Sequence, residues 1–199
     1  MEKAPLSRRD ELLDLAATMF AERGLRATTV RDIADSAGIL SGSLYHHFKS
    51  KEQMVEEVLR DFLDWLFARY QEIVETEPDP LARVSGLFMT SFEAIEHRHA
   101  QVVIYQDEAK RLSSLPQFDF LDERNREQRG MWVDVLKQGV AQGCFRPDLD
   151  VDLVYRFIRD TTWVSVRWYQ PGGPLTAEQV GRQYLAIVLG GITTPSEAN

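Results

Sequence analysis

The side chains best suited to bind a polyanion lie in the stretch TVRDIADSAGILSGSLYHHFKSK, which runs from Thr29 to Lys51. A phenol or an imidazole can exchange hydrogen bonds with base edges, whereas hydroxyl groups at helix starts and ammonium groups attract phosphate oxygens. The candidates for these contacts are Thr29, Ser41, Ser43, Tyr45, His46, His47, Lys49 and Lys51. Their types and spacing predict recognition of double-stranded DNA, with Tyr45 and His46 at the bases and the lysines at the phosphates.

A helix-turn-helix is the arrangement that would present these side chains. The first helix is indicated by an apolar face made of Ile33, Ala34 and Ala37. Gly38 stands where this helix is expected to stop, and the hydroxyl groups of Ser41 and Ser43 are expected to start the next one. Spacing assigns Phe48 to the core of the motif, while His47 suits either a backbone contact or a packed ring.

A second candidate site lies in the carboxyl-terminal half, where Trp163 and Arg167 are four residues apart and are expected to share a helical face. An indole beside a guanidinium could hold a flat apolar body with an anionic end. Further apolar residues for the wall of such a ligand cavity are Leu66, Phe88, Met89, Phe92, Tyr105, Trp132 and Phe157. The alternative is that these side chains form an ordinary core and that Arg167 pairs with Glu108 or Asp160.

Charge is distributed unevenly along the 199 residues. The whole chain carries a formal net charge of -8, which taken alone argues against a polyanionic partner. Residues 1–51 nevertheless hold eight Lys or Arg against seven acids, a net charge of +1, so residues 52–199 carry -9. We therefore predict a DNA-binding domain over residues 1–51 and a helical domain over residues 52–199, whose acidity disfavours unspecific contact with phosphates.

Helical periodicity dominates the chain, and the alternation typical of strands is nearly absent. A helix that begins after Ser7 is expected to end near Gly24, and prolines and glycines separate the later helices. Those helices are expected over 51–77, 81–97, 102–112, 118–142, 150–169 and 176–189. The predicted fold is all-α, with an amino-terminal three-helix helix-turn-helix domain and a carboxyl-terminal helical domain for ligand binding and dimerisation.

Several classes of protein are disfavoured by this sequence. The single cysteine, Cys144, excludes an intramolecular disulfide and is expected to fill apolar space near a helix end. His97 and His99 would point apart on a helix, so no metal site is expected. The chain contains no G-x-S-x-G elbow, no H-E-x-x-H pair and no phosphate-binding glycine loop, which argues against an enzyme. Without a signal peptide or a membrane-spanning run, the protein is expected in the cytoplasm.

The stretch TVRDIADSAGILSGSLYHHFKSKEQMVEEVL, with AATMFAERGLRATTV before it, resembles the DNA-binding domain of the TetR family of transcriptional regulators. The matching residues are Thr29, Ile33, Ala34, Ala37, Gly38, Leu44, Tyr45, His47, Phe48, Lys51 and Leu59. The resemblance implies a homodimeric repressor on the two half-sites of a palindromic operator. The helices over 118–142 and 150–169 are candidates for its interface, because they are long, adjacent and rich in aromatic residues. Packing within one chain is the alternative.

Three further segments, IYQDEAKRL, FDFLDERNREQRGMW and RDTTWVSVRWY, are similar to those of actinobacterial TetR-type repressors of cholesterol catabolism. This similarity implies a small effector and no cofactor. The effector would be a coenzyme A thioester of a steroid-ring degradation product, and the helix over 51–77 would transmit its binding to the DNA contacts. A regulator of multidrug efflux is the main alternative and would need acidic or purely aromatic cavity residues. A thioester-handling enzyme is the third.

Overall fold

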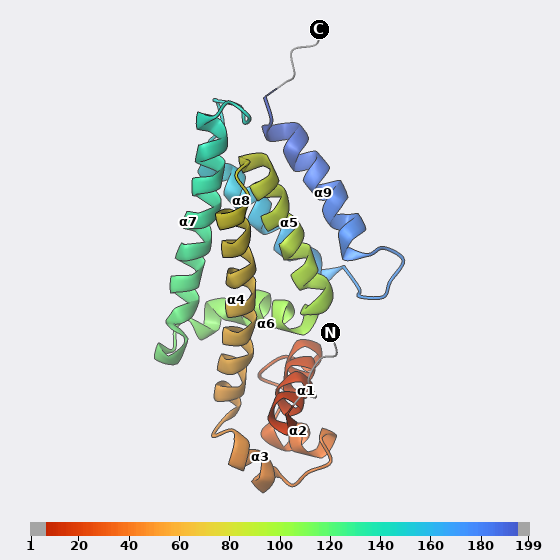
Figure 1. The fold of residues 1–199 in the computed structure, drawn as a ribbon. Helices are drawn as coiled ribbons and strands as arrows, with labels where there is room; N and C mark the ends of the chain where they lie inside the picture. The colour runs from red at the N-terminus through yellow and green to blue at the C-terminus, as the bar shows by residue number, and fades with distance from the viewer. Residues whose placement is uncertain (1–6, 195–199) are drawn as a thin grey trace. The chain divides into compact units, whose positions relative to one another are not determined.

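The computed structural model describes residues 7–194, and within this range the regular elements are helices (Figure 1). The one extended pairing of these residues is an antiparallel bridge between Phe145 and Thr193. The prediction of an all-α protein is confirmed. None of the described helices is long and apolar enough to cross a bilayer.

The chain divides into two compact units, and the division falls inside the long helix α4 (Lys51–Thr76). The first unit comprises residues 1–63 and 100–119, and the second comprises residues 64–99 and 120–199. These limits differ from the predicted domains, because half of α4 and most of α6 (His99–Leu112) group with the first unit. Periodicity shows which residues are helical, but not which other helices they pack against.

The first unit begins with three short helices. They are α1 (Arg8–Arg23), α2 (Val30–Ser36) and α3 (Ser41–His47). Capping boxes start the first two, since the hydroxyls of Ser7 and Thr29 accept hydrogen bonds from the backbone of Asp10 and Asp32, whose carboxylates accept in return. A cap of this kind contributes about 0.5–2 kcal/mol. These short helices therefore owe part of their stability to their first residues.

The core of the first unit brings α2 and α3 together. The stripe that α1 buries consists of Leu12, Leu13, Ala16, Ala17, Met19 and Phe20. Ala34 of α2 is fully buried, and its small side chain leaves room for the crossing of α3. Gly38 adopts a φ of 67° in the turn that follows, which residues with a side chain rarely adopt. This turn sets the direction in which α3 leaves α2.

In the second unit, α5 (Pro80–His97) packs against three other helices. The three are α7 (Phe120–Ala141), α8 (Val151–Val164) and α9 (Ala177–Ile192). Figure 1 shows α5 side by side with the carboxyl-terminal helix α9. Asp79 caps α5 by accepting from the N–H groups of Leu81 and Ala82. Pro80 occupies the first turn, where its missing N–H is not needed. The predicted helix over 81–97 is thus present, one residue longer.

One expected helix is wrong at its end. The helix predicted over 150–169 stops at Val164 and continues as a 3₁₀ turn, Ser165–Arg167. The Ser165 hydroxyl donates to the carbonyl of Thr162 at 2.6 Å, and the last turn is rich in β-branched residues, which lower helix propensity. Similarly, the residues before α7 form a separate 3₁₀ turn, Pro116–Phe118, where a continuous helix from Phe118 was expected.

Candidate nucleic-acid interface and effector cavities

The residues at and just after α3 separate into buried and exposed side chains. Leu44 and Phe48 are buried, so the prediction that Phe48 belongs to the core is confirmed. Tyr45, His46 and His47 are exposed, and Tyr45 keeps 55% of its surface accessible. This short helix therefore presents three consecutive groups that can exchange hydrogen bonds with base edges or phosphates.

Two arginines of α1 hold the helix-turn-helix in place. The guanidinium carbon of Arg9 lies 4.6 Å from the centroid of the Phe48 ring, and its nitrogen pairs with the carboxylate of Glu57 at 2.5 Å. Arg8 donates to the backbone carbonyl of Ala37 at 2.9 Å, at the end of α2. These contacts fix α2 and α3 within the first unit, so that the exposed side chains project from a supported frame.

Lys51 has a structural role that the sequence did not indicate. Its ammonium donates to the carbonyl oxygens of Leu25 and Thr28 at 2.6 and 2.9 Å. It fastens the turn between α1 and α2, a role beside the phosphate contact that the sequence predicts for it. Thr29 is exposed beside this turn, and its hydroxyl and N–H donate to Asp32, which lowers the pKa of that carboxyl.

The serines do not cap α3. Leu40 is the N-cap residue, no side chain bonds the first N–H groups, and Ser41 is already the first helical residue. The expectation that the hydroxyls of Ser41 and Ser43 start this helix is therefore wrong. Ser43 and Lys49 are exposed and Ser41 is half-buried, so all three side chains remain accessible to a ligand.

The residues predicted to line one effector cavity lie in separate places. Leu66 and Phe88 are packed in the core of the second unit, whereas Tyr105 belongs to the first unit, where its ring contacts Phe62. Phe157 is exposed. The other predicted cavity residues of the second unit divide between two cavities, with Met89 and Phe92 at one, and Trp132 and Trp163 at the other. Spacing identified the apolar positions but not their partners on other helices.

Trp163 is buried at a small cavity between α5, α7 and α8. The cavity volume is about 10 Å³, and its wall consists of Ser91, Gln128, Trp132, Tyr155, Ile158, Arg159, Thr162 and Trp163. The side-chain hydroxyl of Thr162 is buried here without a hydrogen-bond partner. Leaving such a hydroxyl unbonded destabilises the fold by about 1–3 kcal/mol. A polar ligand atom that reached the hydroxyl would form this missing hydrogen bond without a further desolvation cost for the protein.

Arg159, and not Arg167, brings a guanidinium to this cavity. Arg159 precedes Trp163 by four residues on α8, and its guanidinium carbon lies 5.8 Å from the centroid of the Tyr155 ring. Arg167 is exposed beyond the end of α8, so the predicted shared face of Trp163 and Arg167 is not formed. Arg159 and Arg167 are each four residues from Trp163 in the sequence. Because α8 ends at Val164, only Arg159 lies on the same helix as Trp163.

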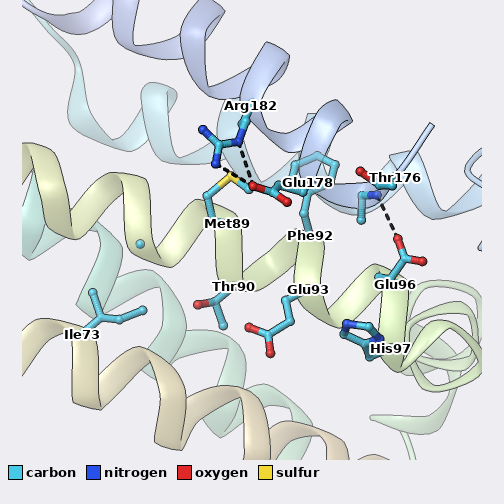
Figure 2. A pocket seen from close by; sticks show the side chains of 12 residues that line it. Ile73, Met89, Thr90, Phe92, Glu93, Glu96, His97, Thr176, Glu178 and Arg182 are labelled. Atoms are coloured by element: carbon cyan, nitrogen blue, oxygen red, sulfur yellow. Dashed lines mark hydrogen bonds and ion pairs between the residues drawn. The ribbon is translucent and has the colours of Figure 1, made fainter.

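A larger cavity of about 670 Å³ lies between α5 and α9 of the second unit. Figure 2 shows Glu93 and Glu96 on α5, and Glu178 and Arg182 on α9. Arg182 pairs with Glu178 at 2.6 Å. The lining carries three carboxylates, and two of them are ion-paired, Glu178 with Arg182 and Glu93 with Arg69 of α4 at 3.2 Å.

Glu96 is the most firmly held of these carboxylates. It accepts hydrogen bonds from the Tyr169 hydroxyl and, at 2.9 Å, from the N–H of Ala177. The bonds from Tyr169 and then from Ala177 lower the pKa of Glu96, while burial and the nearby carboxylate raise the pKa of Tyr169 to about 12. Glu96 is therefore ionised at neutral pH and holds the start of α9 to α5.

Apolar side chains are exposed on α8 and α9 around a shallow groove. The groove has a volume of about 230 Å³ and is lined by Phe157, Thr161, Val164, Tyr184, Ile187 and Val188. Ile187 is 66% exposed, and Phe157 and Val164 are also exposed. Exposed apolar side chains that adjoin one another mark contact surfaces. No exposed large apolar side chain of the described residues lies on α7, which we had expected at the interface.

Two family models match the chain, one that ends inside α4 and one that begins after it. The bacterial regulatory proteins of the tetR family match residues 12–58, and the tetracyclin repressor-like C-terminal domain matches residues 77–192. The chain belongs to the TetR family. The resemblance found around Thr29 to Leu59 is confirmed, and the protein is a TetR-type DNA-binding transcriptional repressor.

Relatives within the TetR family match almost the whole chain. The HTH-type transcriptional repressor KstR2 of Mycolicibacterium smegmatis is 84% identical over 189 residues, which cover 95% of this chain and 92% of the relative. The structure of the ketosteroid transcriptional regulator KstR2 of Mycobacterium tuberculosis has a TM-score of 0.95 and 76% identity, covering 96% of this chain and 97% of that one. AibR in complex with isovaleryl coenzyme A and operator DNA shares the fold, with a TM-score of 0.79 and 22% identity over 91% of this chain and 97% of AibR.

Proposed function

We propose that this TetR-type protein is a cytoplasmic homodimer that represses genes of steroid catabolism from a palindromic operator and leaves the operator when a coenzyme A thioester binds. The observation that carries the proposal is the 84% identity with the KstR2 repressor over 95% of the chain. A second relative with the same name is described as a ketosteroid transcriptional regulator, which supports a steroid-derived acyl group.

The DNA contacts in this proposal come from the exposed side of α3 and its flanks. Tyr45 and His46 exchange hydrogen bonds with base edges, because side chains on the recognition helix reach the major groove. Phosphate contacts are assigned to exposed or half-buried groups around them, namely Thr29, Ser41, Ser43, His47 and Lys49. Lys51 has one N–H left for a phosphate, since its ammonium already donates to two backbone carbonyls.

Dimerisation is assigned to α8 and α9. One helix-turn-helix contacts only one half-site, so specific binding needs the helix-turn-helices of two chains held at a fixed spacing. The groove lined by Phe157, Val164 and Ile187 supplies exposed apolar area on both helices, and two such helices from each protomer make a four-helix interface. α7 is replaced in this role by α9.

The effector's acyl group is assigned to the cavity of Trp163. Two indoles and a phenol surround this cavity, and the unpaired Thr162 hydroxyl offers a hydrogen bond. Arg159, whose guanidinium also pairs with Asp160 at 2.7 Å, is suited to an anionic end. The cavity is almost closed, with a volume of about 10 Å³. An acyl group must therefore open it, and a ligand that fits only the open state shifts the protein toward that state.

The transmission to DNA is assigned to α4. This helix runs without interruption from Lys51 to Thr76, and its half in the second unit is fastened by Arg124 of α7. The guanidinium of Arg124 pairs with Asp64 at 2.5 Å and lies 4.8 Å from the centroid of the Phe67 ring. A displacement of α7 by the effector would thus displace α4, and couplings of about 1–3 kcal/mol correspond to roughly 5- to 150-fold changes in operator affinity.

One observation favours a second candidate effector. The cavity between α5 and α9 has ample volume and carries Glu93, Glu96 and Glu178, which suits a lipophilic cation and disfavours an anionic thioester. A regulator of multidrug efflux would use this cavity. The relatives named as transcriptional repressors support a regulator over a thioester-handling enzyme.

Release of a bound operator distinguishes these candidates. The full-length protein is first used to select its preferred duplex from a random pool, and the complex is then titrated with a coenzyme A thioester of a steroid-ring acid or with a lipophilic cation. We expect release by the thioester at concentrations at which free coenzyme A and the cation have no effect. Release by the cation alone would replace the proposed effector, and release by neither would remove the ligand-response part of the proposal.

A further inference from the structure

Leu40 is the most exposed large apolar side chain among residues 7–194, with 80% of its surface accessible. The first unit exposes only one other such side chain in its described part, and that is Tyr45 of α3. All the rest lie between residues 153 and 187 of the second unit. Within the first unit, exposed apolar surface is thus concentrated at the helix that carries the candidate base contacts.

Folding does not account for a leucine at this position. Leu40 is the N-cap of α3, and its carbonyl accepts from the N–H groups of Ser43 and Leu44 at 2.9 and 3.4 Å. A side chain with an oxygen would also bond the first N–H groups, as Ser7 and Thr29 do at α1 and α2, and leucine is among the poorest N-cap residues. The backbone of Leu40 is therefore fixed, while its side chain neither caps the helix nor enters the core.

The surroundings leave Leu40 open to a large partner. Beyond the adjacent residues and the backbone of α3 itself, no atom lies within 4 Å of the place where a Cβ on Gly42 would stand, so this side of the first turn is free for close approach. The first residues of a recognition helix reach base edges in the major groove, and the 5-methyl of thymine is the apolar group displayed there. An apolar side chain at the start of α3 matches that group and no phosphate.

We propose that Leu40 contacts the 5-methyl group of a thymine in each operator half-site and so selects an A·T pair at that position. The inference rests on the proposed entry of α3 into the major groove and adds a base-selecting residue to it. It also separates two roles on one helix, with Tyr45 and His46 supplying hydrogen bonds and Leu40 supplying a contact that only a methyl group satisfies.

Replacement of thymine by deoxyuridine tests this directly, because the two bases differ by that methyl group alone. Each thymine of the duplex selected by the full-length protein is replaced in turn, and affinities are measured at fixed salt. We expect one position in each half-site where the change weakens binding by about three- to fivefold. With Leu40→Ala that position should lose its sensitivity, and with Leu40→Met, which keeps an apolar side chain, the sensitivity should remain.

A matched control is Leu175→Ala, which shortens an exposed leucine of the second unit and should leave the uracil scan unchanged. The exposure of Leu40 means that Leu40→Ala folds normally. If wild type and Leu40→Ala respond alike to every uracil while wild type still selects its duplex, the inference is overturned and the proposed function stands. If wild type selects no duplex at all, both are overturned.

Discussion

The two units hold their candidate sites in opposite ways. In the first unit, the DNA contacts stand on a short helix whose inner side is packed and clamped by Arg8 and Arg9, and the outer groups project freely. In the second unit, the cavity of Trp163 is assembled from three helices and is almost closed. If the assignments proposed above hold, the DNA contacts are preformed, whereas the proposed effector site must change shape to be filled, and this change can be coupled to DNA.

The largest expected effect comes from removing the support of the preformed site. Phe48→Ala deletes a buried ring on which Arg9 rests and should destabilise the first unit by about 3–5 kcal/mol. Denaturant unfolding measures this loss, and amide exchange places it. A loss confined to the second unit would contradict the account of how α3 is held.

Removing an exposed group should leave stability intact and reduce affinity. Tyr45→Ala is expected to weaken binding to the selected duplex by about 10- to 100-fold for each half-site, the range of a base-edge contact. Because Tyr45 is exposed, the free energy of unfolding of the variant should stay within about 0.5 kcal/mol of the wild-type value. An unchanged affinity at moderate salt would remove Tyr45 from the interface.

Two arginines sharpen the comparison within the second unit. Arg159→Gln changes the small cavity, and Arg182→Gln changes the large acidic one. We expect Arg159→Gln to raise the thioester concentration for half-release by about tenfold, the cost of one charge-assisted hydrogen bond, with operator affinity unchanged in the absence of effector. Arg182→Gln is the control and should behave like wild type. The reverse pattern would move the effector to the cavity between α5 and α9.

Two lysines make the same comparison within the first unit. Lys49 is exposed, whereas Lys51 is bonded to the carbonyls of Leu25 and Thr28. Lys49→Ala should reduce the slope of the logarithm of the affinity against the logarithm of the salt concentration by about 0.9 for each bound helix-turn-helix. Lys51→Ala should instead lower the unfolding free energy, with little change of slope. Equal slopes for Lys49→Ala and wild type would show that Lys49 does not neutralise a phosphate.

The smallest effect concerns pH. The pKa of Glu96 is lowered from its usual 4.5 by hydrogen bonds from Tyr169 and Ala177. Its contribution to stability is therefore present above pH 4.5 and is lost as the pH falls through the lower, folded pKa. As the pH falls across that window, the free energy of unfolding of wild type should decrease relative to that of Glu96→Gln, by less than about 1 kcal/mol. Parallel stability curves for the two proteins between pH 3 and pH 6 would contradict this anchoring.

Much of the first unit could be predicted from the sequence because its determinants are local. A hydroxyl three residues before an acid marks the starts of α1 and α2, and Gly38 marks the turn, so the exposed side of α3 followed from spacing. The backbone contacts of Lys51 could not be predicted, since its partners Leu25 and Thr28 lie more than twenty residues away. Leu40 was overlooked because an apolar residue carries no pattern that distinguishes exposure from burial.

The proposed effector site could not be predicted in the same way, because it depends on contacts between helices. Trp132 and Trp163 were recognised as cavity candidates, and they do line one wall together. Their neighbour Ser91 comes from α5, and Gln128 of α7 is a polar residue with no local signal for burial. Arg159 could not be distinguished from Arg167 in the sequence, because both are four residues from Trp163. The end of α8 at Val164, which leaves Arg167 outside the helix, distinguishes them.

The central claim is that two copies of α3, presented by a symmetric pair of chains, select one DNA sequence. The most direct test is the ratio of affinities of the full-length protein for its selected palindromic duplex and for a scrambled duplex of equal length at moderate salt, with stoichiometry from the same titration. We predict a ratio of at least about 10³ and two chains for each pair of half-sites. A ratio below about tenfold, or full affinity from a single chain, would contradict the account.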